Sequence, residues 1–150
     1  MKNLFTQTGL RWWWLTAIFL IADQVTKQLI VSNMDLYQSI DILPFFNLTY
    51  VHNLGAAFSF LADQGGWQRW FFTAIAAIAS IVFIVWLAKT PKQQVLLSVA
   101  FAFMLSGAVG NLIDRVLFGY VIDFLDFYGF GYHFPAFNIA DSMIFIGAAL

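Results

Sequence analysis

Residues 70–88 read WFFTAIAAIASIVFIVWLA, a stretch without one charged side chain. A helix needs about 20 mostly apolar residues to cross the hydrocarbon core of a bilayer, so this stretch predicts a transmembrane helix. Residues 95–113, VLLSVAFAFMLSGAVGNLI, predict a second one, and the short polar turn KTPKQQ separates the two.

Two further stretches extend this pattern toward the ends of the chain. Residues 12–31 predict a span that begins with three tryptophans, a typical anchor at the membrane interface. This span contains Asp23 and Lys27, which share one helix face and are expected to form an ion pair. Residues 136–150 predict a fourth span, but they would rise only about 22 Å as a helix. We therefore expect the sequence to stop before this span is complete.

The composition also points to a membrane environment. Of the 150 residues, 61% are hydrophobic and 10% are charged, whereas soluble domains carry about 25% charged residues. We predict an all-α membrane protein in which residues 1–150 form one domain with four transmembrane helices. Cysteine is absent from the sequence, which excludes disulfides and thiol nucleophiles.

The basic residues predict the orientation of the chain. Lys2 and Arg11 precede the first span, while Lys89 and Lys92 lie between the second and the third. With four spans these residues share one side, which the positive-inside rule makes cytoplasmic. The segments 32–69 and 114–135 are then external.

The two external segments differ in character. Residues 45–53, FFNLTYVHN, alternate in polarity and predict a short strand or hairpin, a small β cradle lying on the membrane. Residues 116–135 are rich in aromatic residues and glycine, and predict an interfacial loop segment.

Asp141 is the first candidate for chemistry. It lies about five residues into the fourth predicted helix, roughly 7 Å below the outer surface. An ionisable residue at such a depth is a functional candidate. Attraction by the helix dipole is the alternative explanation, but this effect fades within the first turn. Asn138 lies three residues earlier on the same face and could orient the carboxylate.

Asp123 is the second candidate, flanked by the apolar residues Ile122 and Phe124. Asp126 lies close by in the same segment, and either residue could be an ordinary solvated carboxylate. The pattern of residues alone does not choose between them.

Further polar residues lie at the ends of the predicted spans. Asn111, Asp114 and Arg115 close the third span, and a structural salt bridge explains them as well as a direct role does. Arg115 runs against the charge bias and needs a partner, for which Asp114 or another external aspartate is expected. Asn53 is expected at a turn.

Several classes of function have no matching motif. The two histidines do not form an HExxH motif, and GxSxG, a phosphate loop and a basic stripe for nucleic acid are also missing. Two neighbouring carboxylates can share one proton, so that one acts as acid and the other as base toward water. A metal-free peptidase is therefore one hypothesis. A proton-coupled transporter that uses buried aspartates is the alternative, and a non-enzymatic scaffold is a third.

Five short pieces, taken in order around four spans, resemble those of bacterial lipoprotein signal peptidase, also called signal peptidase II. They are DQVTK at 23–27, NLGAAF at 53–58, GNLIDR at 110–115, VIDF at 121–124 and FNIAD at 137–141. This resemblance implies an aspartyl endopeptidase of the membrane that removes signal peptides from prolipoproteins, just before a diacylglyceryl-modified Cys. It also implies that Asp123 and Asp141 are the catalytic pair.

The resemblance implies supporting roles and partners as well. Residues Asn53, Asn111, Arg115 and Asn138 would line the site or contact the substrate, while Asp23 and Asp114 would support it. The enzyme would use no metal or other cofactor and would bind no nucleic acid. It would act as a monomer among lipids of the bacterial inner membrane, with its N-terminus cytoplasmic and its site toward the periplasm. It would be inhibited by globomycin-type cyclic peptides.

Overall fold

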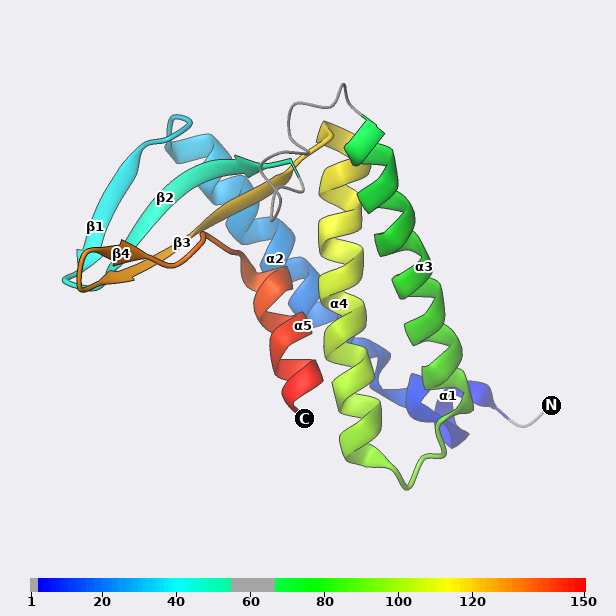
Figure 1. Cartoon of the computed structure of the whole chain (residues 1–150). Helices are drawn as coiled ribbons and strands as arrows, with labels where there is room; N and C mark the ends of the chain where they lie inside the picture. Colours follow the sequence, from blue (N-terminus) through cyan, green and yellow to red (C-terminus); the bar gives the residue numbers. More distant parts are fainter. Residues whose placement is uncertain (1–2, 55–66) are drawn as a thin grey trace.

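A computed structural model describes residues 3–54 and 67–150 of the chain. Its helices lie side by side in one bundle, with a small sheet at one end (Figure 1). The main helices are α2 (Trp13–Asn33), α3 (Trp67–Lys89), α4 (Val95–Phe118) and α5 (Ile139–Ala149). Before them come the short helix α1 (Leu4–Gln7) and a 3-10 helix, η1 (Gly9–Trp12). The N-terminal elements and the turn between α3 and α4 lie at the end opposite the sheet (Figure 1).

Within the described residues, three helical stretches are long and apolar enough to cross a bilayer, namely Gly9–Asn33, Trp67–Lys89 and Val95–Phe118. The fourth predicted span corresponds to α5, an apolar but shorter helix. Large apolar side chains cover the outside of the bundle, among them Ile21 and Ile78, each 62% exposed. Such a surface requires lipid rather than water around it. The predicted fold class of a helical membrane protein with a small external sheet is confirmed.

Small residues let the helices approach closely around α4. A side chain at Gly107 would collide with the backbone oxygen of Ala140, and one at Gly147 would meet the side chain of Met104 at 2.6 Å. Close packing through glycine is the usual basis of helix association in membranes. It brings the start of α5 against the outer half of α4.

The sheet has four antiparallel strands in the order β1-β2-β3-β4. They are β1 (Ser39–Leu43), β2 (Phe46–Asn53), β3 (Val121–Gly129) and β4 (Tyr132–His133). The strand predicted within 45–53 is therefore present as β2. In the register of β2 and β3, Val51 lies opposite Asp123 and Asn53 lies opposite Val121.

The prediction of a loop over 116–135 is wrong for most of its length, because β3 and β4 occupy the segment. Val121, Ile122, Asp123 and Phe124 are all buried. A strand buried on both faces lacks the alternation of polar and apolar residues by which strands are recognised. Gly119 supplies the left-handed conformation, with φ of +85°, that ends α4 and lets the chain turn into β3.

The core beneath the sheet joins it to α2. Ile122 and Phe124 of β3 pack with Ile30, Met34 and Tyr50 in one buried cluster. This packing lays the first half of β3 across the bundle end, where α2, α4 and α5 also meet.

Candidate active site

Asp123 lies in β3 with only 1% of its surface exposed. The side-chain amide of Asn138 donates a hydrogen bond of 2.8 Å to its Oδ1. The amide of Asn53, at the end of β2, donates one of 3.1 Å to its Oδ2. Both oxygens of this buried carboxyl group therefore have a donor, as buried polar groups require.

Asp141 lies in the first turn of α5, in a capping box with Asn138. The Asn138 side chain accepts a hydrogen bond of 2.7 Å from the backbone N–H of Asp141, while Asp141 Oδ2 accepts one of 3.3 Å from Asn138 N–H. The amide of Asn111 donates to Asp141 Oδ1 at 2.9 Å. Asp141 thus serves as a helix cap in addition to any chemical role.

The prediction that Asp141 lies more than one turn inside the helix is wrong. The helix begins at Ile139, because Phe137 is extended and continues the sheet. Its backbone N–H donates to Leu125 O at 3.1 Å, and its own oxygen accepts from the N–H of Phe124 and of Leu125. The depth of Asp141 in the membrane therefore lends no support to its role, whereas its neighbours do.

Asn138 connects the two acidic residues. Its side chain is fully buried, and its amide donates to Asp123 and also, at 3.2 Å, to Asn111 Oδ1. The side-chain amide of this one asparagine thus contacts the Asp123 carboxyl group directly and is linked to the Asp141 carboxyl group through Asn111, while its backbone N–H bonds Asp141 itself. Sequence spacing placed Asn138 beside Asp141, but its contact with Asp123 depends on the fold.

The pKa of Asp123 is raised to about 7, first by burial and second by the negative charge of Asp141. The hydrogen bonds from Asn53 and Asn138 act in the opposite direction. Desolvation and a neighbouring like charge both favour the neutral form of a carboxyl group. Asp123 is therefore suited to hold a proton near neutral pH.

A buried ionic cluster lies directly behind the two acids. Lys27 Nζ is 2.8 Å from Asp23 Oδ2, which confirms the ion pair expected within the first span, and 2.9 Å from Asp114 Oδ2. The two carboxylates also bind backbone: Asp23 accepts from Ala140 N–H at 2.9 Å, and Asp114 from Ile122 N–H at 3.0 Å. The cluster therefore fixes the starts of α5 and β3 onto α2 and α4.

Lys27 also reaches the site through Asn111. Its Nζ donates to Asn111 Oδ1 at 3.2 Å, which leaves the amide N–H of Asn111 to face Asp141. The sequence indicated Lys27 only as the partner of Asp23. The hydrogen bond from Lys27 to Asn111 joins residues 84 positions apart, and no local sequence pattern predicts such a contact.

The expected partner of Arg115 was Asp114 or another external aspartate, and Asp114 is not that partner, because it binds Lys27. Within residues 3–54 and 67–150, Arg115 has no carboxylate within 4 Å, and its guanidinium lies 5.5 Å from the ring of Phe72. The charges of Asp141 and Asp123 still act on it. Arg115 thus contributes a positive charge near the pair without neutralising either member.

Asp126 occupies a separate place on β3. It accepts a hydrogen bond of 2.8 Å from Thr49 Oγ1 and lies 2.9 Å from His133 Nδ1. The sequence alone left Asp123 and Asp126 as equal candidates. The structure brings Asp123 to Asn53 and Asn138, and keeps Asp126 with the residues of the sheet.

With this geometry in view, the chain can be compared with known proteins. A family model described as signal peptidase (SPase) II matches residues 15–150. The chain belongs to the signal peptidase II family. It is 63% identical over its whole length to a lipoprotein signal peptidase of Alteromonas mediterranea, covering 82% of that protein. It is 56% identical to one of Shewanella amazonensis, covering 89%.

Solved structures agree with the signal peptidase II assignment. Two structures described as a bacterial membrane enzyme, obtained by the in meso method, superpose with a TM-score of 0.79 each. Their sequences are 40% and 39% identical to this one, over 90% of this chain and 80% and 85% of theirs. The resemblance noted from the five sequence pieces is thereby confirmed, although residues 55–58 of the NLGAAF piece lie outside the described residues.

A hollow of about 520 Å³ opens beside Asp141 in this signal peptidase II chain. Apart from Asp141 and Ser142, its lining is apolar, consisting of Phe134, Phe137, Phe145 and Ile146. A carboxylate at the edge of an apolar hollow is the combination expected where a largely apolar ligand meets a reactive group.

Proposed function

We propose that this signal peptidase II family member is an aspartyl endopeptidase, with Asp123 and Asp141 as its catalytic pair. Its substrates are prolipoproteins, which it cleaves just before the diacylglyceryl-modified Cys. The observation that carries the proposal is the shared hydrogen-bond network of the two acids, in which the side-chain amide of Asn138 bonds Asp123 and its backbone N–H bonds Asp141. The environment that favours a neutral Asp123 supports a division of roles within the pair.

In this mechanism Asp141 is the base and Asp123 the acid. Asp141 takes a proton from a water molecule, whose oxygen forms a bond to the carbonyl carbon of the scissile peptide. Asp123 gives its proton to the carbonyl oxygen, and the tetrahedral intermediate then collapses as the carbon–nitrogen bond breaks. The leaving amine takes the proton held by Asp141, and a hydroxyl group of the intermediate returns its proton to Asp123 as the carbonyl group re-forms, so that the two acids again share one proton.

The surrounding residues support specific steps of this reaction. Asn53 and Asn138 hold the Asp123 carboxyl group in position, and Asn111 holds Asp141. The positive charge of Arg115 near the pair suits the stabilisation of the oxyanion or of a substrate carbonyl. Asp23 and Asp114 act indirectly, by fixing the helices and the strand that carry the site.

The hollow beside Asp141 supports a lipid-modified substrate. Its apolar lining lies on α5 and on the residues leading into it, within a bundle whose outer surface is also apolar. A substrate that carries acyl chains can approach this hollow from the bilayer without leaving a hydrophobic environment. The apolar part of the substrate next to the scissile bond would occupy it.

We infer that the chain lies in the bacterial inner membrane with its N-terminus in the cytoplasm and the site toward the periplasm. Basic residues at the two ends of the bundle support this orientation. Arg11, Lys89 and Lys92 belong to the N-terminal end, against Arg69 and Arg115 at the sheet end. The absence of a metal requirement, the monomeric state and inhibition by globomycin-type peptides stay predictions.

The arrangement of carboxylates favours a peptidase over a proton-coupled transporter. Asp23, Asp114, Asp123 and Asp141 belong to one connected network at one end of the bundle. A proton path through the membrane would require ionisable groups along its whole depth.

The test is the separate replacement of Asp123 and Asp141 by Asn, with Asp126→Asn as the matched control on the same strand. Each of the first two variants should remain inserted and lose prolipoprotein cleavage by several orders of magnitude, whereas D126N should cleave normally. Cleavage at the wild-type rate by D123N or D141N would overturn the proposal.

A further inference from the structure

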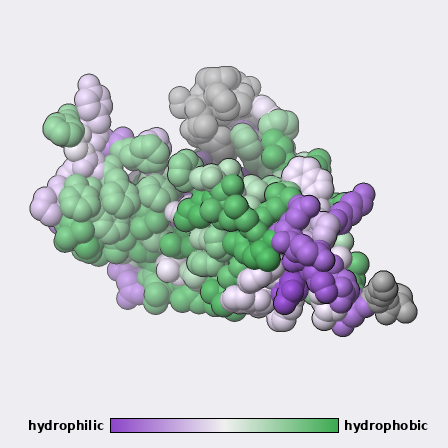
Figure 2. Space-filling view, turned by 90° about the horizontal axis from the view of Figure 1, so that it is seen from below, coloured by the Kyte–Doolittle hydropathy of each residue, from purple (hydrophilic) through white to green (hydrophobic). Residues whose placement is uncertain are grey.

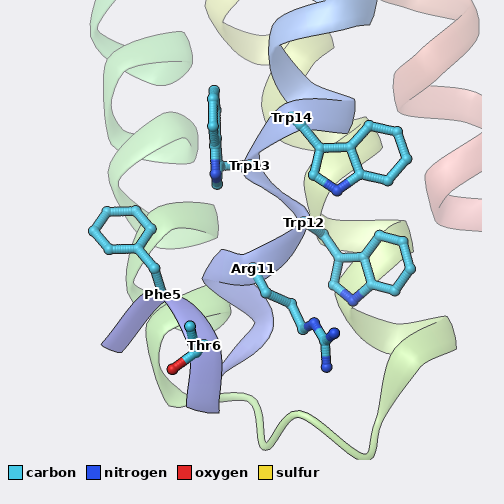
Figure 3. A pocket seen from close by; sticks show the side chains of 6 residues that line it. All are labelled: Phe5, Thr6, Arg11, Trp12, Trp13 and Trp14. Carbon is cyan, nitrogen blue, oxygen red and sulfur yellow. The ribbon is translucent and has the colours of Figure 1, made fainter. Parts of the chain in front are cut away.

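A second hollow, of about 460 Å³, lies at the end of the bundle opposite the candidate active site. It is formed by α1, η1 and the first turn of α2 (Figure 3). Its lining residues are Phe5, Thr6, Arg11, Trp12, Trp13 and Trp14. One cation and three indoles around a single hollow make this a site of mixed polar and aromatic character.

The indole of Trp12 supplies an unused hydrogen-bond donor at this hollow. In residues 3–54 and 67–150, its Nε1–H is the one buried side-chain polar atom without a hydrogen-bond partner. An indole N–H can only donate, and a buried donor without an acceptor is rare enough to require an explanation. Figure 3 shows the indole nitrogen turned toward the guanidinium of Arg11.

Because Arg11 and Trp12 are both donors, neither can satisfy the other. An anionic oxygen between them would accept a hydrogen bond from each. Arg11 is exposed, so its side chain can swing aside to admit such a ligand. The geometry of guanidinium groups suits phosphate oxygens in particular.

The hollow lies at the boundary between lipid and water. Trp13 and Trp14 are exposed at the start of α2, and Ile18, one turn further on, is 51% exposed on the lipid-facing surface. Next to this apolar surface, hydrophilic surface gathers over the N-terminal end of the molecule (Figure 2). Tryptophans at such a boundary, with basic residues beside them, are typical of contact with lipid headgroups.

The backbone around the hollow is fixed by the rest of the bundle. Gly9 N–H donates to Thr90 O at 2.8 Å, and Thr8 pairs with Pro91 in the turn between α3 and α4. A side chain at Gly9 would meet Ser98 Oγ at 2.7 Å, so η1 packs closely on α4 as well. The backbone of Arg11 and Trp12 is therefore held in place before a ligand binds, and only the exposed Arg11 side chain has to move.

We propose that Arg11 and Trp12 bind the phosphate of an anionic phospholipid from the membrane leaflet at the N-terminal end. The guanidinium and the indole N–H donate to the phosphate oxygens, and the exposed rings of Trp13 and Trp14 pack against the glycerol and the first methylene groups. The site is separate from the peptidase site and does not depend on the proposed catalytic roles.

Native mass spectrometry of the full chain in detergent, titrated with phosphatidylglycerol, tests the proposal. The variant Arg11→Gln should weaken phosphatidylglycerol binding about tenfold, because a charge-assisted hydrogen bond is lost. Trp12→Phe, which removes the N–H and keeps an aromatic ring, should weaken it about threefold. Arg11→Lys should retain part of the affinity, since the positive charge remains.

Matched controls at the same end of the molecule are Trp86→Phe and Lys89→Gln, which lie outside the hollow. Both should bind phosphatidylglycerol like the wild type. A loss in Lys89→Gln as large as that in Arg11→Gln would mean diffuse attraction and overturn the proposal. So would equal binding of phosphatidylcholine, or displacement of the lipid by inorganic phosphate at the same concentration.

Discussion

Among single residues, Asn138 combines a structural and a chemical contact. Its Oδ1 caps α5, while its amide reaches Asp123 at 2.8 Å. Serine caps helices as well as asparagine does, but it is too short to replace the amide. Asn138→Ser should therefore cost about 1 kcal/mol less stability than Asn138→Ala, yet both should slow cleavage more than tenfold.

Unfolding in detergent and the rate of prolipoprotein cleavage measure the two effects of Asn138 separately. Wild-type cleavage by Asn138→Ser would contradict a role for the amide. Equal loss of stability in the two variants would instead contradict the capping contact.

The pH dependence of cleavage follows from the state of Asp123. With a pKa of about 7, Asp123 is protonated below neutral pH and loses its proton as the pH rises. Since the proposed acid must carry a proton, kcat/KM should fall as the pH increases through about 7. Asn53→Ala removes a hydrogen bond that favours the charged form, so the pKa should rise and this decline should move to higher pH.

Measured profiles of kcat/KM against pH test this shift of the Asp123 titration. Thr49→Val is the control, since Thr49 bonds Asp126 and not Asp123. Its profile should match the wild type, and an unmoved decline in Asn53→Ala would contradict the assignment.

The sequence predicted which residues belong to the site better than it predicted their contacts. Asp23 with Lys27, and Asn138 with Asp141, lie within one turn of each other, so helical spacing is enough to pair them. The hydrogen bond from Asn53 to Asp123 spans 70 positions, and pairing of β2 with β3 creates it. Choosing Asp123 over Asp126 needed the family resemblance, because both lie in the same apolar surroundings.

Among the helices, α4 approaches both α2 and α5 closely at Gly110. An added Cβ there would lie 2.5 Å from Asp23 Oδ2 and 3.2 Å from the Cβ of Ala140. Gly110→Ala should therefore push Asp23 out of its cluster, lower stability by about 1–3 kcal/mol and reduce cleavage. Gly129→Ala, where nothing lies within 4 Å of the new atom, is the control.

Thermal unfolding and cleavage of the two glycine variants, purified in the same detergent, measure these effects. Gly129→Ala should behave as the wild type. Unchanged stability in Gly110→Ala would contradict the close packing of α4 against the Asp23 carboxylate.

The prediction of helices and strands from the sequence failed where tertiary contacts, rather than the local pattern of polar and apolar residues, determine the structure. The spans were predictable because lipid imposes long apolar stretches, whereas β3 was missed because Ile122 and Phe124 are buried next to an equally buried Asp123. The start of α5 was misplaced for a related reason. Residue Phe137 bonds the backbone of β3, so the helix cannot begin before Asn138.

For the whole molecule, the proposed orientation places Gln93 and Tyr132 on opposite sides of the membrane. Gln93 is exposed in the turn between α3 and α4, and Tyr132 is 79% exposed in β4. The native chain has no cysteine, so in a variant with a single introduced cysteine the label can react only at that position. On intact cells, a membrane-impermeant maleimide should label Tyr132→Cys and spare Gln93→Cys.

Permeabilised cells provide the control for this labelling, since both cysteines should then react. Labelling of Gln93→Cys in intact cells would reverse the proposed orientation. The distribution of basic residues would in that case have another cause.

The spacing of Asp23 and Lys27 also matters while the chain is being synthesised. Lys27 finds one partner within its own helix, but Asp114 follows only 87 positions later, by subtraction of the residue numbers. At roughly 5–20 residues per second, this interval lasts about 4–17 s. During that time the nascent first helix can enter the bilayer with its lysine already neutralised, so membrane insertion need not wait for the ribosome to reach the third span.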